Sequence, residues 1–430
     1  TALAANTTAS NNVAIGSYAM DASTTGANNT AVGTLALTTN TTGANNIAMG
    51  YGALASNSTG ANNVALGNSA LTQSTTASEN VAVGYAALYD NTTGQLNTAV
   101  GSNALRYNTT GTSNTAMGRL ALYVNVGGGY NSSYGMNSLK SNTSGNYNVA
   151  LGYEALQANT SGTSNTAVGM YSGKFTTTGQ GITAIGYSAL NANTTASYNT
   201  AVGYQALTSN TTGGQNVAVG FQALTDNTTA SNNTAVGHSA LLANTTGGQN
   251  TAVGYQALKD NLTGPSNTAV GQVALANNTT GGGNNALGYH SLETNTTGSS
   301  NNAFGESALR YATTASSNSA FGNAAGTSVT TGTSNTFVGA ACGDGTATGS
   351  YNTAVGAGAL SVACVSGNTA IGEVALRDCT GSNQTAIGQN AGLTATSGLN
   401  NTFLGRDAGR TGSPGGAITT QSHIVIIGDE

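Results

Sequence analysis

Side chains that could carry acid–base or metal chemistry are few in this chain, and they lie far apart. The three histidines are His238, His290 and His423, and the 14 acidic residues are scattered along the 430 positions. Catalysis and metal binding both need such groups to converge, with ligand spacings that are absent here. The sequence therefore predicts no enzyme activity, no catalytic residues, no metal site and no cofactor.

Aromatic residues form a candidate binding row. They directly follow a recurring glycine in successive repeats, in the order Tyr187, Tyr204, Phe221, His238 and Tyr255. Aromatic rings have a large apolar face, so the row could stack on the sugar rings of a receptor glycan. It could equally be edge packing that shields a turn, and both interpretations remain open.

A second candidate is the repeated triplet Asn-Thr-Thr, which matches the acceptor sequence for N-glycosylation. It occurs among other places at Asn40, Asn91, Asn210 and Asn244. Asn and Thr are also turn residues, so the triplet predicts either a glycosylated surface or a structural turn.

All these features lie on one strict period. Glycines recur every 17 residues from Gly16 to Gly356, 21 in register, and Gly372, Gly388 and Gly405 follow at spacings of 16, 16 and 17. The consensus around this ruler glycine (position 0) is N-T-A-V-G-x-x-A-L-x-x-N-T-T-G-x-x. Such a unit is too short for helical repeats. It fits one coil of a parallel β-solenoid with two strands of about five residues each and two turns.

Conserved columns within the repeat indicate what each position faces. Position −1 is apolar in all 24 copies, −2 is Ala in 21, and +4 is Leu in 18 and Gly in five. Because −1 and −2 point to opposite faces of a strand, the strand is expected to be buried on both sides. One side would be the core of the coil. The other would lie on a second copy of the chain, with Ala at −2 allowing close approach. A monomer with a wider coil is the alternative.

Position −4 is Asn in 22 of the 24 copies, so stacked coils should form a ladder of amide hydrogen bonds. The predicted ladder includes Asn12, Asn29, Asn46, Asn63, Asn199, Asn216, Asn233, Asn250 and Asn352.

Cysteines give one further prediction. Cys342 replaces the usual Ala at +3 and is expected to be buried, whereas Cys364 and Cys379 lie at +8 and +7 of adjacent coils. Stacked coils are about 4.8 Å apart, within the Cα separation that a disulfide needs. We therefore expect a disulfide between Cys364 and Cys379, with two free thiols as the alternative.

Composition narrows the functional class. Only 23 residues are charged and the net charge is −5 with no basic cluster, which argues against nucleic-acid binding. No apolar run is long enough to span a membrane. The expected organisation is a regular solenoid over 1–360, degenerate repeats continuing it over 361–410, and a register break with a capping strand over 411–430. The chain opens within a repeat, which suggests that it is not an unprocessed natural N-terminus.

The repeats N-T-A-V-G-Y-Q-A-L (199–207) and N-V-A-V-G-F-Q-A-L (216–224) resemble the heads of trimeric autotransporter adhesins and the repeat shafts of phage tail fibres. The resemblance implies a homotrimer of parallel, left-handed β-rolls at a cell or virion surface. The expected function is an extracellular fibre or adhesin shaft of about 24 coils that gives reach and attachment, with surface carbohydrate or another receptor as a partner beside the chain itself. The alternatives are a glycosylated filament or sheath and an ice-binding solenoid.

Overall fold

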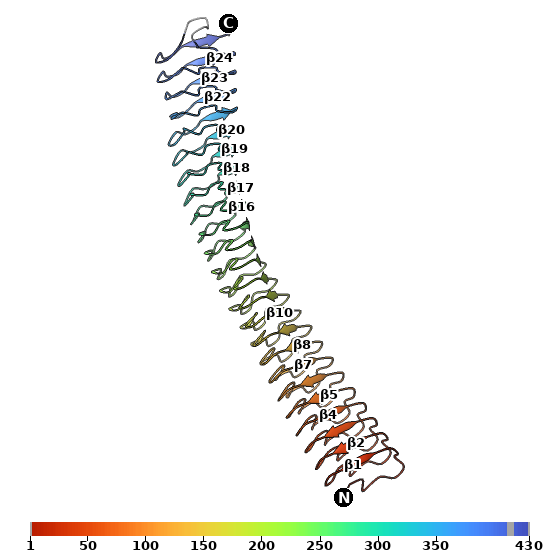
Figure 1. Cartoon of the computed structure of the whole chain (residues 1–430). Helices are drawn as coiled ribbons and strands as arrows, with labels where there is room; N and C mark the ends of the chain where they lie inside the picture. The colour runs from red at the N-terminus through yellow and green to blue at the C-terminus, as the bar shows by residue number, and fades with distance from the viewer. Residues whose placement is uncertain (1, 411–416, 429–430) are drawn as a thin grey trace. The chain divides into compact units, whose positions relative to one another are not determined.

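The computed structural model describes residues 2–410 and 417–428, which form two units that meet in sequence between Gln215 and Asn216. Each unit is a parallel β-solenoid whose short strands stack in chain order (Figure 1). All regular structure in the described ranges is β, which confirms the predicted all-β solenoid and its 17-residue period. None of the described residues forms a helix of the length and hydropathy needed to cross a membrane.

The first unit holds twelve strands of three residues each. They are β1 (Val13–Ile15), β2 (Thr30–Val32), β3 (Ile47–Met49), β4 (Val64–Leu66), β5 (Val81–Val83), β6 (Thr98–Val100), β7 (Thr115–Met117), β8 (Ser132–Tyr134), β9 (Val149–Leu151), β10 (Thr166–Val168), β11 (Thr183–Ile185) and β12 (Thr200–Val202).

The second unit holds the remaining thirteen. They are β13 (Val217–Val219), β14 (Thr234–Val236), β15 (Thr251–Val253), β16 (Thr268–Val270), β17 (Asn285–Leu287), β18 (Asn302–Phe304), β19 (Ser319–Phe321), β20 (Thr336–Val338), β21 (Thr353–Val355), β22 (Thr369–Ile371), β23 (Thr385–Ile387), β24 (Thr402–Leu404) and β25 (Val425–Ile427).

Strand register follows the repeat. Ala31 pairs with Ala48 one period later, and the shorter spacings appear as the pairing of Ala354 with Ala370. The degenerate repeats thus continue the ladder, and β25 pairs in parallel with β24. Of the register break and capping strand expected over 411–430, residues 411–416 and 429–430 lie outside the described residues, and β25 lies in the described part.

Each coil has one strand, so the expectation of two five-residue strands was wrong. The rest of the coil is a series of tight turns, because the backbone adopts positive φ at four positions. In one coil these are Asn28 (60°), Gly33 (133°), Leu35 (60°) and Leu37 (52°), at −5, 0, +2 and +4. Left-handed residues interrupt an extended strand, and their recurrence limits it to positions −3 to −1.

The ruler glycine is required twice over. Its φ lies in a region that only glycine occupies readily. A Cβ on Gly33 would also lie 2.6 Å from the carbonyl oxygen of Gly50 in the next coil, far closer than real contacts. The 17-residue glycine spacing is therefore a steric consequence of stacking.

The interior of each coil is narrow and filled by small side chains. Ala31 (−2), Ala36 (+3) and Leu37 (+4) have no exposed surface. Ala201 and Ala218, which we expected at an axis shared between chains, are likewise buried inside their own coils. That expectation was wrong in its assignment of faces, because −2 points inward and the apolar residues at −1 point outward.

Leucine at +4 is exchanged for glycine where a larger neighbour takes its space. Phe337 replaces Ala at −2 and lies between Gly326 and Gly343, and Phe403 lies in the same way between Gly392 and Gly409. A Cβ on Gly326 would meet the Phe337 ring at 2.7 Å, and one on Gly392 would meet Phe403 at 2.8 Å. Glycine also adopts the left-handed conformation at +4 without strain. One phenylalanine thus fills the volume of two leucines.

Because glycine at +4 leaves room for the phenylalanine, we expect removal of the phenylalanine ring to reduce local stability strongly. Phe337→Ala should cost about 3–5 kcal/mol of local stability, because neither flanking +4 residue has a side chain to fill the cavity. Adding Gly326→Leu and Gly343→Leu should recover much of it, since leucine adopts the same conformation at +4 in other coils. Amide hydrogen exchange over β19 and β20 measures the change.

The matched control is Thr331→Ala, which shortens an exposed turn side chain of the Gly322 coil, outside the core, and should have little effect. Equal exchange rates in the Phe337→Ala protein and the parent would contradict this account of the core.

Candidate functional site

Two asparagine columns meet at one backbone carbonyl inside each regular coil. In the coil of Gly33, the side-chain amides of Asn29 (−4) and Asn40 (+7) donate to the carbonyl oxygen of Gly43 (+10), at 2.8 and 2.9 Å. Asn46 and Asn57 bind Gly60 in the same way, both at 2.9 Å. We call this arrangement the asparagine node. It satisfies an inward carbonyl that no strand partner reaches.

The −4 asparagines also connect successive coils. The Oδ1 atom of Asn29 accepts the backbone N–H of Asn46 at 2.9 Å, and the Nδ2 of Asn46 lies 3.1 Å from the same Oδ1. Most bonds of this ladder therefore run from a backbone N–H to a side-chain oxygen. The side-chain Nδ2 atoms are used mainly to donate to the +10 carbonyl of the node. The other residues predicted for this column make one or both of these contacts. They are Asn12, Asn63, Asn199, Asn216, Asn233 and Asn250. Asn352 differs, because its backbone N–H donates to Asn335 Oδ1 but its side-chain Nδ2 has no partner.

Asparagines at +7 form a second buried ladder that sequence reasoning missed. Asn57 Nδ2 donates to Asn40 Oδ1 at 2.9 Å, and Asn108 Nδ2 donates to Asn91 Oδ1 at 2.7 Å. The four asparagines that we considered for glycosylation (Asn40, Asn91, Asn210 and Asn244) have no exposed surface. Each donates its amide to a +10 carbonyl, so a glycan does not fit on them in the folded coil. The structural interpretation of Asn-Thr-Thr is the one that matches the fold.

The +7 ladder is interrupted where another residue replaces asparagine. The acceptors Asn57 Oδ1, Asn159 Oδ1 and Asn295 Oδ1 are buried without a hydrogen-bond partner. The residues one coil further on are Ser74, Thr176 and Ala312, and none of them donates to these oxygens. A buried unsatisfied acceptor costs about 1–3 kcal/mol, so each interruption is a local weak point.

The aromatic row is present, but its rings face one another. Tyr187 and Tyr204 stack with centroids 5.3 Å apart and an interplanar angle of 13°. In the second unit Phe221 stacks on His238, which lies 5.3 Å from Tyr255. Ring faces that cover each other leave no room for a sugar between them, so the row presents mainly edges to solvent. This geometry favours the shielding role over glycan stacking.

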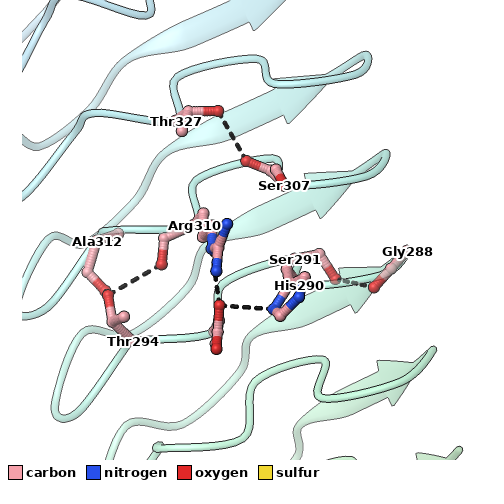
Figure 2. A network of polar contacts seen from close by, with 9 residues as sticks. Gly288, His290, Ser291, Thr294, Ser307, Arg310, Ala312 and Thr327 are labelled. Atoms are coloured by element: carbon pink, nitrogen blue, oxygen red, sulfur yellow. Dashed lines mark hydrogen bonds and ion pairs between the residues drawn. The ribbon is translucent and has the colours of Figure 1, made fainter.

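Ion pairs link neighbouring coils at a few places. The Oε2 atom of Glu293 is 2.7 Å from the Nε of Arg310 and 2.7 Å from the Nδ1 of His290. Arg310 and His290 are labelled in Figure 2. In the same view Thr327 donates to the carbonyl oxygen of Ser307 at 2.9 Å. These turns are tied together by side chains as well as by the strand ladder.

A similar pair joins Lys174 to Glu154 at 2.8 Å. Although burial alone would raise the pKa of Glu154, hydrogen bonds from Lys174 and Tyr153 hold it below the ordinary value. No group of three or more His, Cys, Asp or Glu side chains that could hold a metal ion occurs within the described ranges.

The three cysteines are buried free thiols. Burial raises the pKa of Cys342 to about 11, as expected for a small residue in the core. Cys364 and Cys379 lie next to each other, with the Cys364 thiol donating to the Cys379 carbonyl oxygen at 2.8 Å. The structure thus brings the predicted pair together, but as thiols and not as the disulfide. The contact between the two side chains raises the pKa of Cys364 and lowers that of Cys379.

No protein-family model matches the chain, and no curated protein matches it significantly.

The interrupted ladder gives a test of the node. Ser74→Asn should stabilise the first unit by about 1–2 kcal/mol, because the new amide can donate to the orphaned Asn57 Oδ1. Its own Oδ1 can also accept from Asn91, and the change removes a buried serine hydroxyl that has no partner. Hydrogen exchange over β4 to β6 would report the gain as slower exchange.

Ser56→Asn makes the same substitution one coil away, outside the column, and should change little. Faster exchange in the Ser74→Asn protein than in this control would contradict the ladder.

Proposed function

We propose that the chain is a structural shaft of an extracellular fibre that assembles with copies of itself through one face of each solenoid. The observation that carries the proposal is the strand face, which we define as the outward side chains at −3 and −1. Position −1 is apolar or aromatic in every repeat, and neither position holds a charged residue. Many of these side chains are more than a third exposed, including Met49, Leu151, Leu287, Phe321 and Leu404.

The size of the strand face supports self-association. With strands about 4.8 Å apart and three residues wide, each unit presents roughly 500 Å² of this surface. The −1 side chains form the apolar part of this face, whereas −3 is Thr, Ser or Asn in 18 of the 24 repeats. A long exposed apolar row on a soluble chain is typical of an interaction site. Interfaces of stable complexes bury about 800 Å² per partner, so the strand face of one unit would supply more than half of that area. A homotrimer, the assembly implied by the resemblance to adhesin heads and fibre shafts, would bury this face around a common axis.

The proposed role is mechanical. Every coil adds about 4.8 Å of reach and is joined to the next by backbone and side-chain hydrogen bonds. In the described residues, most contacts between ionisable side chains are ion pairs between a basic and an acidic residue. Such pairs are typical of a structural scaffold. Placement outside the cell, and attachment to a receptor, rest on the resemblance of the repeats to surface fibres.

The two alternatives have weaker support. A glycosylated filament requires accessible +7 asparagines, and these are buried. An ice-binding face requires ranks of outward hydroxyls, yet Thr41 and Thr92 at +8 donate theirs to carbonyl oxygens of the next coil, at 2.9 and 3.1 Å. The threonine beside each of them, at +9, is exposed but forms a single rank.

Charge on the strand face tests the proposal. The triple change Val253→Glu, Val270→Glu and Leu287→Glu should reduce the particle mass to that of one chain, because buried unpaired charges cost several kcal/mol each and repel across a symmetric interface. The native protein should be an oligomer in the same light-scattering measurement.

The control carries the same three charges on the exposed +9 positions of the same coils, as Thr263→Glu, Thr280→Glu and Thr297→Glu, and should remain oligomeric. A native particle of 42.0 kDa, the mass of one chain, would overturn the proposal. An unchanged mass in the strand-face variant would place the contact elsewhere and refute this interface.

A further inference from the structure

The first unit departs from the repeat at three interior positions that lie close together. In the coil of Gly169, which contains β10 (Figure 1), glycine replaces leucine at +4 and threonine replaces asparagine at +7. The next coil has Ile182 at −4, where 22 of the 24 repeats have asparagine. Gly173, Thr176 and Ile182 are all buried, so these departures lie inside the stack of coils.

Both asparagine nodes at this place have one amide donor in place of two. The carbonyl oxygen of Gly179 accepts from Asn165 at 2.9 Å, and that of Ala196 accepts from Asn193 at 3.1 Å. In a regular coil a second asparagine amide binds the same oxygen. Here threonine holds the second position in one coil, and isoleucine, which cannot donate, holds it in the other.

Both ladders are interrupted at the same place. The Oδ1 atom of Asn159 is buried without a partner. The amide of Asn193 donates to Thr176 Oγ1 at 3.3 Å, against 2.7 and 2.8 Å for two earlier amide pairs of this column. On the −4 side, Asn165 Oδ1 still accepts the backbone N–H of Ile182, but the isoleucine offers no acceptor to the coil that follows. Interior polar bonding is therefore weaker at this junction than between regular coils.

Apolar packing is compensated here, although polar bonding is not. A Cβ on Gly173 would lie 3.5 Å from the Cδ1 of Ile182 and 3.1 Å from the Cδ2 of Leu156. The isoleucine thus fills the volume that leucine occupies at +4 in regular coils. The φ of Gly173 is 56° and that of Leu156, at +4 of the preceding coil, is 50°, so the backbone keeps the regular conformation.

Contacts on the outside of the same coil connect it to both neighbours. Lys174 pairs with Glu154 of the preceding coil at 2.8 Å, and its ammonium lies 4.8 Å from the ring centroid of Tyr171. Tyr171 packs edge to face on Tyr153, with centroids 5.5 Å apart, and on Tyr187 of the following coil, at 6.1 Å. An ion pair and ring contacts at the surface thus join the coils where the buried amides do so least.

We infer that the coil of Gly169 is a joint of the first unit, where the stack opens before the neighbouring coils do and where Lys174 and Tyr171 hold it closed from outside. Local opening is favoured where buried bonds are few and the connecting contacts reach solvent. The amide ladders on either side stay bonded when the joint opens, so strain along the unit is released at one coil. The joint lies within one chain and does not depend on self-association.

Hydrogen exchange of the full chain at neutral pH, resolved by peptide, tests the joint. In the parent protein β10 and β11 should exchange at least about tenfold faster than β7 and β8, whose coils keep both ladders. The triple change Gly173→Leu, Thr176→Asn and Ile182→Asn restores the repeat. It should slow β10 and β11 to the rate of β7 and β8, because the new +7 amide can donate to Asn159 Oδ1.

Thr178→Asn is the matched control for the interior, because it makes one of the same substitutions at the exposed +9 position of that coil and should change nothing. Lys174→Ala tests the outer contacts and should speed exchange of β10 and β11 by about three- to tenfold. Its control is Lys140→Ala, which removes a lysine from the same +5 column two coils earlier and should have no effect there.

An unchanged far-ultraviolet circular dichroism spectrum shows that each variant is folded. Parent β10 and β11 that exchange as slowly as β7 and β8 would overturn the joint, and so would a folded triple variant that keeps the parent rate. Equal rates in the Lys174→Ala and Lys140→Ala proteins would refute the outer contacts as its closure. If the triple variant does not fold, the parent profile and the two lysine variants still decide the question.

Discussion

The carbonyl oxygen at +10, bound by two buried asparagine amides, is the interaction on which each regular coil depends. A chain that closes a loop in 17 residues turns several backbone groups inward, and the strand ladder reaches only positions −3 to −1. Water cannot enter so narrow an interior, so polar side chains must satisfy those groups. Asn29 and Asn40 do this for Gly43, and their Oδ1 atoms continue the bonding into the next coil.

A core closed by asparagine leaves little volume for hydrophobic side chains. Alanine at −2 and +3 and leucine at +4 fill it, and even one phenylalanine requires glycine at two leucine positions. The apolar residues at −1 then have no place inside their own chain. Met49 and Leu287 are exposed for this reason. The narrow interior therefore leaves the apolar −1 residues on the outside of the coil. Self-association is the simplest way to bury them.

Much of this fold could be predicted from the sequence, because its period is strict. The ruler glycine and the apolar columns gave the parallel solenoid, its register and the interior place of leucine at +4. Sequence reasoning left two interpretations open where two columns could be told apart only by their partners. Asn40 and Asn29 look alike as repeated asparagines, but the first also begins a sequon, so a glycosylated surface and a structural turn both fitted it.

The sequence also did not show which side of the strand faces the interior of the coil. Ala201 and Val202 are adjacent and both apolar, so alternation alone could not say which one points into the coil. Stacking of Tyr187 on Tyr204 depends on ring rotamers that no spacing reveals.

Exchange of the asparagine side-chain amide protons measures the node most directly. In protein labelled with ¹⁵N at asparagine, the amides at −4 and +7 should exchange as one slow population, at least about a hundredfold slower than those of exposed asparagines such as Asn28 and Asn45, because their release requires a coil to open. A single fast population, with buried and exposed asparagines exchanging alike, would contradict the account.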